Sequence, residues 1–430
     1  MIILALNCGS SSVKYKLYFW EKRETITKGV VERIGIPGSF ISFSVPGQGE
    51  RKIEFDCPDH HTALKEIINT LTHQEYGVIH ELRDIIAVGH RVVHGGEKFK
   101  SSTLINGEVL EAIKHVQDLA PLHNPPNIAG IEAAQEVLPN IPHIAVFDTA
   151  FHQTMPESSF LYAVPYEWYG MYGVRRYGFH GTSHLYVSRR ASVLLGKPPL
   201  ETNLITMHIG NGVSVSAIKG GISVDTSMGL TPLEGAVMGT RCGDIDPAII
   251  LFMIEKEGFY AEELDSILNK KSGLLGLTGK YMDRRDIEKA AGEGDRRAQL
   301  AMEIEAYRLK KYIGAYAAAL GRVDAVVFTA GAGELNWRLR EKVVDGLESL
   351  GLKLDKKKNE QTISREAETV ISAEDSPVKI MVIPTDEEIV FIEDVVAIIE
   401  GRYETHTHFT YSFEKPNYRK KGDSVLGTRD

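Results

Sequence analysis

The sequence predicts an α/β protein built from two related domains, and three features of the chain support this prediction. With 430 residues, the chain is too long for a single ordinary hydrophobic core. Two widely separated stretches, residues 2–18 and 204–218, repeat one design of strand, polar turn and second strand. Strand-like and helical patterns alternate through the rest of the chain, as they do in α/β folds.

Each repeated stretch predicts a β-hairpin whose turn consists of small polar residues. The first hairpin has strands over residues 2–6 and 13–18, and the second has strands over residues 204–209 and 213–218. Small residues in the two turns permit positive φ and close approach, so backbone N–H groups can converge on an anion. We therefore expect the two turns to clamp one nucleotide between the two domains.

The other elements of the first half follow from apolar periodicity and turn residues. They are a strand-like region over residues 40–55, a helix over 61–71, a strand over 85–88, a helix over 109–119 that the proline-rich residues 121–126 stop, a helix over 127–138 and a strand over 143–147. Asp148 directly follows this last strand. The carboxyl end of a buried strand is a common active-site position in α/β folds.

In the second half, the same signals predict a long helix over residues 295–320, a strand over 323–329, a turn over 330–334, a helix over 336–347, a strand over 380–384 and a helix that ends at Glu400. The residues that follow are polar and aperiodic, which predicts a tail of uncertain order. We expect a first domain over residues 1–150 completed by residues 386–400, a second domain over residues 151–385, and a tail over residues 401–430.

Composition narrows the class of protein. The formal net charge of −9 argues against nucleic acid or an anionic membrane as the main partner. The three cysteines, Cys8, Cys57 and Cys242, lack metal-ligand spacing and fit a reduced cytoplasmic location. The apolar start of the chain is short and lacks a basic leader, so it is interpreted as a first strand and not as a signal peptide. No stretch approaches the length of a membrane span.

The densest functional signal is the loop over residues 225–247, which is rich in Gly, Thr, Asp and Pro without apolar periodicity. This loop resembles the acetate kinase family closely. Seven further stretches share the resemblance: residues 7–14, 90–96, 121–126, 147–152, 176–184, 208–212 and 385–388. Together they span nearly the whole chain up to about residue 400.

The resemblance implies a fold of two duplicated actin-like (RNase H-like) domains with an active-site cleft between them. It also implies reversible, Mg²⁺-dependent transfer of the γ-phosphoryl group of ATP to acetate, which gives acetyl phosphate and ADP. Mn²⁺ is a second candidate metal. The family further suggests a homodimer formed through the second domain.

The residues themselves support phosphoryl-transfer chemistry, which needs charge neutralisation and in-line placement more than covalent help. Arg91 and Arg241 lie in glycine-flanked loops, where each could hold a carboxylate or phosphoryl oxygen at about 1.5 to 3 kcal/mol per charged hydrogen bond. A carboxylate nucleophile, with a pKa of about 4.3, is already ionised at neutral pH. No general base is required, so we expect Asp148 to orient Arg91 or to hold the Mg²⁺ shell.

The resemblance assigns the metal side to Asn7 and Glu387, although Glu388 is an alternative for the carboxylate. His180 and His184 have the spacing of a zinc pair but lack the glutamate of an HExxH motif, so a zinc site is disfavoured. The family instead suggests that His180 hydrogen-bonds the transferring phosphoryl group. His123 is a weaker candidate for the same region, and a structural role for it is equally consistent with the sequence.

For the nucleotide, the resemblance points to both hairpin turns and to two further stretches. The phosphate side would involve Ser10, Ser12, Lys14, His208, Ile209, Gly210, Asn211 and Gly212, and the nucleoside side Asp283, Arg284, Arg285, Gly331, Ala332, Gly333, Glu334 and Leu335. At the stretch that corresponds to residues 331–335, the family usually has Gly-Ile-Gly-Glu-Asn. Here the fifth position is Leu335, and the asparagine follows as Asn336. This difference leaves base selectivity, and a donor other than ATP, open.

For the acid, the resemblance surrounds the methyl group with Val93, Leu122, Phe179 and Pro232. Relatives that prefer propionate tend to carry a smaller residue in place of Val93, so acetate is favoured. One methylene is worth only about 1 to 3 kcal/mol, so propionate should remain a poor substrate. Two alternatives stay open: a kinase for propionate or another short acid, and a non-catalytic actin-like or Hsp70-like ATP switch.

Overall fold

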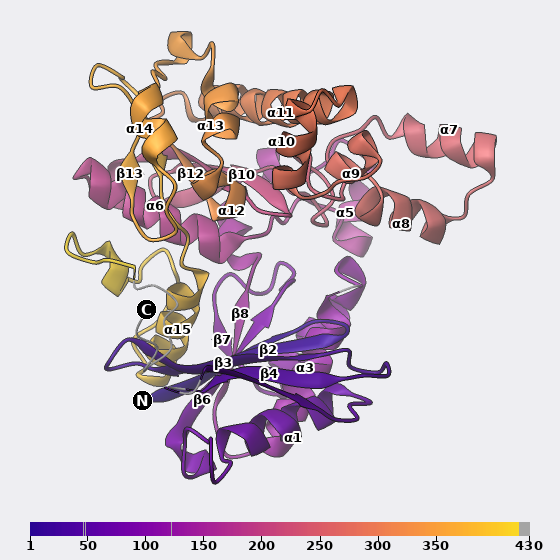
Figure 1. Cartoon of the computed structure of the whole chain (residues 1–430), viewed down its shortest axis with the longest axis vertical. Helices are drawn as coiled ribbons and strands as arrows, with labels where there is room; N and C mark the ends of the chain where they lie inside the picture. Colours follow the sequence, from indigo (N-terminus) through magenta and orange to yellow (C-terminus); the bar gives the residue numbers. More distant parts are fainter. Residues whose placement is uncertain (46, 48, 122, 421–430) are drawn as a thin grey trace. The chain divides into compact units, whose positions relative to one another are not determined.

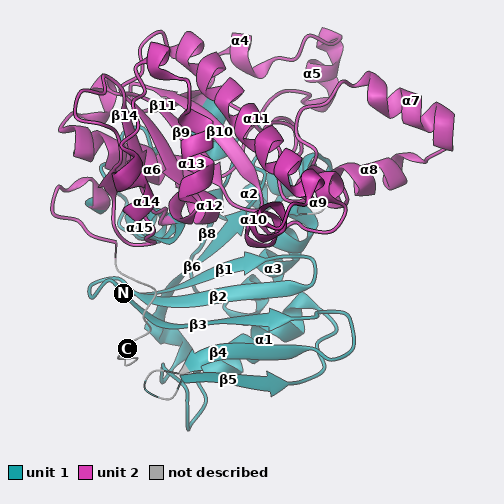
Figure 2. Ribbon diagram, turned by 45° about the horizontal axis from the view of Figure 1, so that its top comes forward, with its two compact units in different colours: residues 1–153, 387–412, 421–430 teal, residues 154–386, 413–420 magenta. Residues whose placement is uncertain are grey.

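The computed structural model describes residues 1–45, 47, 49–121 and 123–420. These residues form two compact units (Figure 2). Unit 1 contains residues 1–153 and 387–412, and unit 2 contains residues 154–386 and 413–420. The chain therefore passes from one unit to the other after residues 153, 386 and 412.

Unit 1 is built on an eight-stranded sheet with the order β5-β4-β3-β2-β1-β6-β8-β7. The strands are β1 (Ile2–Cys8), β2 (Ser12–Phe19), β3 (Glu24–Glu32), β4 (Phe40–Val45), β5 (Gly49–Glu54), β6 (Ile85–Val92), β7 (Thr103–Leu104) and β8 (His143–Phe147). The first predicted hairpin is present, because β1 and β2 pair antiparallel with Asn7 opposite Lys14. β6 pairs parallel with both β1 and β8, so the carboxyl ends of these three strands lie at one edge of the sheet.

Helices cover both faces of this sheet (Figure 1). The helices are α1 (His60–Leu71), α2 (Gly107–His115), α3 (Asn124–Val137) and α15 (Glu387–Ile399). α1 and α3 share one apolar cluster with Leu4 and Leu6 of β1, while α15 shares another with Ile3. α3 starts three residues earlier than predicted, because a proline in the first turn of a helix lacks only an N–H that has no intrahelical partner.

Unit 2 repeats the same topology. Its six-stranded sheet has the order β11-β10-β9-β12-β14-β13. The strands are β9 (Asn203–Ile209), β10 (Val213–Lys219), β11 (Ile222–Thr226), β12 (Ala325–Thr329), β13 (Thr369–Val370) and β14 (Lys379–Val382). β9 and β10 form the second predicted hairpin, and β12 pairs parallel with β9 and β14. The run β11-β10-β9-β12-β14 therefore corresponds to β3-β2-β1-β6-β8, as expected for a duplicated domain.

The helices of unit 2 are α4 (Glu157–Phe160), α5 (Tyr166–Tyr172), α6 (Gly181–Leu195), α7 (Ala248–Glu257), α8 (Ala261–Lys270), α9 (Gly273–Thr278), α10 (Arg284–Gly292), α11 (Arg296–Leu320), α12 (Ala330–Leu335), α13 (Trp337–Val344) and α14 (Lys356–Gln361). The turn predicted over residues 330–334 is wrong, because these residues form α12. Glycine has a low intrinsic helix propensity, but packing can outweigh that preference. Gly333 and Glu334 are buried, so packing stabilises the helix here. No helix in the described ranges is long and apolar enough to span a membrane.

Residues 402–420, which the sequence suggests are a polar tail, contain buried aromatic side chains. Tyr411 and Phe413 are only 1% and 0% exposed. The Tyr411 hydroxyl donates to Asp394 of α15 within unit 1, and the Phe413 ring packs against Tyr186 of α6 within unit 2. The sequence pattern concealed this because irregular segments bury single aromatic residues without any helical or strand periodicity.

Candidate functional site

Unit 1 brings Arg91 and Asp148 together at the carboxyl ends of adjacent parallel strands. Arg91 Nε lies 3.0 Å from Asp148 Oδ1, and Arg91 Nη2 lies 2.7 Å from Oδ2, which makes a bidentate ion pair. The Asp148 side chain is 5% exposed, whereas the Arg91 side chain is 34% exposed. The negative charge of Asp148 holds the pKa of Arg91 above its ordinary value. Arg91 is therefore fixed in direction by a buried carboxylate while part of it stays accessible.

The two glutamates at the start of α15 differ in their surroundings. The Glu388 carboxylate pairs with Lys16 of β2. After the larger effect of Asp148, the charge of Glu387 also contributes to raising the pKa of Arg91. Asn7 occupies the carboxyl end of β1, the strand next to β6. An amide oxygen and a carboxylate are thus available near one sheet edge, and Mg²⁺ prefers such oxygen ligands.

The first hairpin turn of unit 1 is exposed to solvent. A hydrogen bond from the Gly9 N–H to the carbonyl of Ser12, at 2.7 Å, holds the turn together. Ser10 and Lys14 are exposed there and Ser12 is partly buried. Their side chains could meet a solvent-borne phosphate.

Unit 2 places His180 at the start of α6 with a left-handed backbone, φ 56°. A non-glycine residue seldom adopts this conformation unless its surroundings enforce it, and such strain often accompanies a functional site. His180 Nδ1 lies 2.8 Å from Ser214 Oγ. The His180 ring also stacks on that of His208, with ring centroids 4.0 Å apart.

The second hairpin turn of unit 2 lies against His180 and Arg241. A methyl group added at Gly212 would stand 3.4 Å from His180 Nε2 and 3.5 Å from Arg241 Nη1, so the two side chains converge on this glycine. A methyl group at Gly239 would stand 2.0 Å from Asn211 Oδ1, so the Asn211 side chain lies directly over Gly239. Only a glycine at position 239 leaves room for the present position of the Asn211 amide.

Arg241 differs from Arg91 in its charge balance. Its Nη1 donates to the carbonyl of Pro232 at 3.2 Å, and within the described part of the chain it forms no ion pair with an acidic side chain. Burial lowers its pKa from the ordinary value. The same Nη1 lies 3.8 Å from the Met238 sulfur, so both contacts are with neutral acceptors. A half-buried guanidinium without a charged partner gains from the arrival of an anion.

The predicted nucleoside residues on α10 are tied to their surroundings. Arg284 pairs with Glu305 of α11 through Nη2 at 2.5 Å, and its Nη1 donates to the carbonyl of Gly210 at 2.8 Å. Arg284 therefore links the hairpin turn to α11. Arg285 is 90% exposed and pairs with Asp283, the N-cap of α10. The Arg285 side chain holds the pKa of Asp283 down at about 2.

The predicted residues Gly331 to Leu335 lie in α12, which Arg340 of α13 holds in place. Arg340 is 0% exposed. Its guanidinium donates to the carbonyls of Gly333 and Glu334 at 2.8 and 2.9 Å, and to those of Asn359 and Thr362 at 3.0 and 2.7 Å. The Glu334 carboxylate accepts from the backbone N–H of Thr385 at 3.1 Å, and burial raises its pKa.

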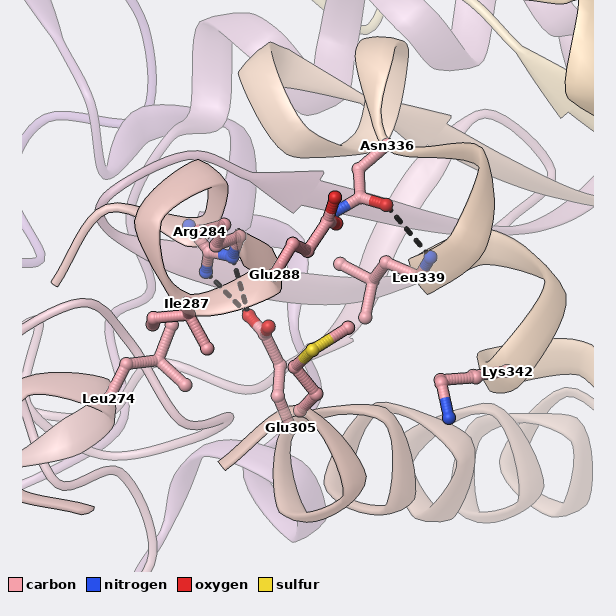
Figure 3. A pocket seen from close by; sticks show the side chains of 9 residues that line it. Leu274, Arg284, Ile287, Glu288, Glu305, Asn336, Leu339 and Lys342 are labelled. Atoms are coloured by element: carbon pink, nitrogen blue, oxygen red, sulfur yellow. Dashed lines mark hydrogen bonds and ion pairs between the residues drawn. The ribbon is translucent and has the colours of Figure 1, made fainter. Parts of the chain in front are cut away.

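A small pocket lies within unit 2 (Figure 3). Its lining consists of Leu274, Arg284, Ile287, Glu288, Met302, Glu305, Asn336, Leu339 and Lys342. The Asn336 amide donates to Glu288 and accepts from the Leu339 N–H at 3.0 Å. The mixture of apolar walls and a few polar groups is typical of small-molecule sites.

The remaining predicted residues are divided between the units. Val93 belongs to unit 1, and Phe179 and Pro232 belong to unit 2, while Leu122 lies outside the described residues. His123 forms the N-cap of α3, and His184 is fully buried in α6.

Sequence reasoning missed three residues that support the site. Ser214 bonds His180, Arg340 holds α12, and Glu288 lines the pocket. A serine in an alternating strand, an arginine on the helix predicted over residues 336–347 and a glutamate in a stretch without a predicted element are common patterns, so none of the three gave a signal.

A model of the acetokinase family matches residues 2–393. An acetate kinase of Geobacter metallireducens is 64% identical over 97% of this chain and 99% of the relative, and one of Thermotoga maritima is 57% identical over 93% and 99%. The crystal structure of Porphyromonas gingivalis acetate kinase matches with a TM-score of 0.88 at 48% identity, covering 93% of this chain and 99% of that one.

A second solved structure, a propionate kinase from Francisella tularensis, matches with a TM-score of 0.84 at 40% identity, covering 92% of this chain and 99% of that one. These matches confirm the predicted actin-like fold.

Proposed function

The chain belongs to the acetokinase family, and we propose from this membership that it transfers a phosphoryl group reversibly between ATP and the carboxylate of acetate. The products in the forward direction are acetyl phosphate and ADP. The observation that carries the proposal is the full-length match to acetate kinases, with Arg91, Asp148, His180 and Arg241 all present in ordered surroundings. The alternative of a non-catalytic ATP switch leaves these residues without a role.

In the proposed reaction, the partly exposed Arg91 holds the acetate carboxylate or the transferring phosphoryl group, and Asp148 keeps its guanidinium in place. The carboxylate of acetate attacks without a base, since it is already ionised. Mg²⁺, or Mn²⁺ in its place, would supply positive charge to the polyphosphate, held by Asn7 and Glu387. The amide and carboxylate oxygens at this sheet edge suit such an ion, because Mg²⁺ usually keeps water and phosphate ligands besides one or two carboxylates.

Unit 2 supplies the groups proposed to stabilise the transition state. Arg241 forms no ion pair within the described ranges, so its charge is available to the equatorial phosphoryl oxygens. His180 would donate a hydrogen bond to the same group. The turn from His208 to Gly212, including Ile209, would hold the polyphosphate through backbone N–H groups, while Ser10, Ser12 and Lys14 of unit 1 would contact the transferred end.

The pocket of unit 2 is proposed to receive the nucleoside. It adjoins Arg284 and Asn336, and α12 with Gly331 and Ala332 precedes Asn336 in the chain. In this chain Asn336, and not residue 335, supplies the amide that lines the pocket. The Glu288 carboxylate beside it could accept a hydrogen bond from the amino group of a purine. We therefore expect ATP to be the phosphoryl donor.

Acetate is the proposed acid, with propionate as the alternative. The match to a propionate kinase shows that the fold itself does not separate the two substrates. Val93, Phe179, Pro232 and Leu122 remain the residues proposed to surround the methyl group, and the size of Val93 favours acetate.

A homodimer is proposed, formed through unit 2. α7 has no buried residue, and Leu251 and Phe252 are 71% and 56% exposed. Met171 and Tyr172 of α5 are each 64% exposed. Contiguous apolar surface on a helix is typical of a self-association interface.

Sedimentation analysis should give a dimer for the wild type and a monomer for Leu251→Glu; a monomeric wild type would contradict the proposal. A cytoplasmic location, where ATP is available, is proposed as well.

The proposed activity is tested by trapping acyl phosphate with hydroxylamine. The assay varies the acid from formate to butyrate, the nucleotide from ATP to GTP and CTP, and the metal from Mg²⁺ to Mn²⁺ or none. We expect the largest kcat/KM for acetate with ATP and a metal. Absence of any acid-dependent product would contradict the enzyme proposal, and a larger kcat/KM for propionate would favour the alternative.

A further inference from the structure

Four side chains of unit 2 form one continuous chain of hydrogen bonds that ends at His180. Thr206 Oγ1 lies 2.7 Å from His184 Nδ1, and His184 Nε2 lies 2.7 Å from Ser214 Oγ. Ser214 Oγ lies 2.8 Å from His180 Nδ1. Thr206, His184 and Ser214 are each 0% exposed. The interior of unit 2 is therefore connected to a partly exposed imidazole through one serine hydroxyl.

The chemistry of a hydroxyl limits how this chain can be arranged. Ser214 has one hydrogen, so it can donate to one of the two ring nitrogens and must accept from the other. In the first arrangement, Thr206 donates to His184, the Nε2–H of His184 donates to Ser214, and Ser214 donates to His180 Nδ1. In the second, every bond in the chain runs in the opposite direction. For neutral rings these are the two fully bonded states.

The two arrangements give His180 different properties at Nε2, the atom beside Gly212 and Arg241. In the first, a neutral His180 carries its proton on Nε2 and can donate to a phosphoryl oxygen. In the second, a neutral His180 presents a lone pair there, which an anionic oxygen would repel. An anion next to Nε2 therefore favours the first arrangement, since a hydrogen-bonding partner on one ring nitrogen sets the tautomer at the other.

We propose that Ser214 is a positioning residue that, with His184 and Thr206 behind it, holds His180 as the neutral Nε2–H tautomer facing the phosphoryl group. The inference rests on the proposed function only in naming that group. The hydroxyl also fixes the direction of the ring, because His180 is held between Ser214 at its Nδ1 and the stacked ring of His208. Second-layer partners of this kind typically change activity by about 10- to 100-fold.

The chain offers a matched control for Ser214. Ser216 lies two residues along the same strand and is also 0% exposed. Its hydroxyl lies 2.9 Å from Thr226 Oγ1 instead of contacting a histidine. Ser216 lies opposite Thr206 in the β9–β10 pair, but it has no hydrogen bond to either histidine. Ser216→Ala therefore removes a buried hydroxyl from β10 and leaves the three hydrogen bonds that lead to His180 in place.

The first measurement is steady-state kinetics of Ser214→Ala, Ser214→Thr and Ser216→Ala. We expect Ser214→Ala to lower kcat by about 10- to 100-fold while KM for acetate and ATP changes by less than about threefold, since the lost contact orients a group used in the transition state. Ser214→Thr keeps the hydroxyl and should recover part of the loss, and Ser216→Ala should keep the wild-type kcat. Equal effects of the two alanine variants would contradict the inference.

The second measurement does not depend on activity. Long-range ¹H–¹⁵N spectra of the histidine-labelled wild type, with the His180 signals assigned from a His180→Asn variant, report which ring nitrogen carries the proton. With inorganic phosphate or ADP and Mg²⁺ bound, we expect His180 to be protonated on Nε2 and to accept at Nδ1. A proton on Nδ1 in this state would overturn the inference. If the wild type forms no acyl phosphate, the proposed function fails while the spectra still decide the tautomer.

Discussion

At the residue scale, the charges of the two arginines proposed to act in the reaction are balanced differently. Arg91 faces a buried aspartate in a bidentate pair, so its charge is already compensated and its direction is fixed. Arg241 contacts two neutral acceptors, the Pro232 carbonyl and the Met238 sulfur, and burial lowers its pKa. Arg91 is therefore suited to orienting a substrate carboxylate, whereas Arg241 is suited to meeting the charge that develops during transfer.

Substitution of Gly239 tests whether the Asn211 side chain binds phosphate. Gly239→Ala would place a methyl group 2.0 Å from the present position of Asn211 Oδ1 and so displace the amide without strain in the backbone. We expect about a tenfold lower kcat/KM for ATP, equivalent to about 1.4 kcal/mol, from Gly239→Ala and from Asn211→Ala alike. The double variant should lose no more than either single variant, because both remove the same contact.

Gly314→Ala is the control for this cycle, since nothing lies within 4 Å of the added methyl group on α11. It should leave kcat/KM unchanged. Additive losses in the double variant would show that Asn211 and Gly239 act separately.

The sequence predicts these site residues unevenly. Arg91 and Arg241 stand out because glycines flank them, and Asp148 because it ends a strand. Ser214 gives no such signal, since its partner His180 lies in another element and an alternating strand contains many serines. Contacts made across elements depend on the register of β9 and β10 and on the position of α6, which local patterns do not contain.

At the element scale, the short helix α12 is held by a buried arginine instead of by its own propensity. A six-residue helix with two glycines is marginal alone. Arg340 supplies donors to the carbonyls of Gly333 and Glu334, which a helix end otherwise leaves without partners. The prediction of a turn over residues 330–334 was wrong because the guanidinium that stabilises α12 belongs to the next helix, α13.

Arg340→Met should therefore destabilise the protein and weaken nucleotide binding. Each buried carbonyl that loses its donor costs about 1 to 3 kcal/mol, so we expect the free energy of unfolding to fall by at least about 3 kcal/mol. KM for ATP should rise several-fold while KM for acetate changes little, if α12 serves the nucleoside. Urea unfolding and steady-state kinetics measure the two effects.

Arg338→Met is the matched control on the same helix. Arg338 is exposed and stacks on Trp337. Its replacement should change the free energy of unfolding by less than about 0.5 kcal/mol, as for most surface substitutions. Equal destabilisation by both variants would show that Arg340 has no special role.

At the scale of the whole molecule, the run β11-β10-β9-β12-β14 in unit 2 repeats the strand order and directions of β3-β2-β1-β6-β8 in unit 1, as the twin hairpins in the sequence suggested. The sequence did not show that residues 402–412 join unit 1 and residues 413–420 join unit 2. In unit 1 this segment covers Asp394 of α15, which accepts hydrogen bonds from Ser102, Tyr411 and Tyr403 at 2.6, 2.8 and 3.2 Å. Burial raises the pKa of Asp394 from 3.8 to about 7.

This raised pKa predicts a specific pH dependence of stability. Between pH 3.8 and about 7 the folded protein keeps a proton on Asp394 that the unfolded chain has lost, so the stability that Asp394 contributes falls as pH rises. Asp394→Asn removes this effect. Relative to the wild type, the variant should gain up to about 1.4 kcal/mol per pH unit across that window.

Urea unfolding of the wild type and Asp394→Asn at a series of pH values measures the difference. The exposed Asp118 provides the control, because Asp118→Asn should follow the wild-type curve. Parallel curves for Asp394→Asn and the wild type would mean that Asp394 is ionised in the folded protein.

The position of α15 has a consequence for how the protein is made. α15 comes from residues 387–399, yet its Ile392 and Val395 cover Ile3 and Val146 of the first sheet. A ribosome that has finished residues 1–153 must still synthesise all of residues 154–386 before this apolar face can be covered. A chain stalled at residue 386 should therefore recruit chaperones that bind apolar surface, and one released after residue 400 should recruit fewer.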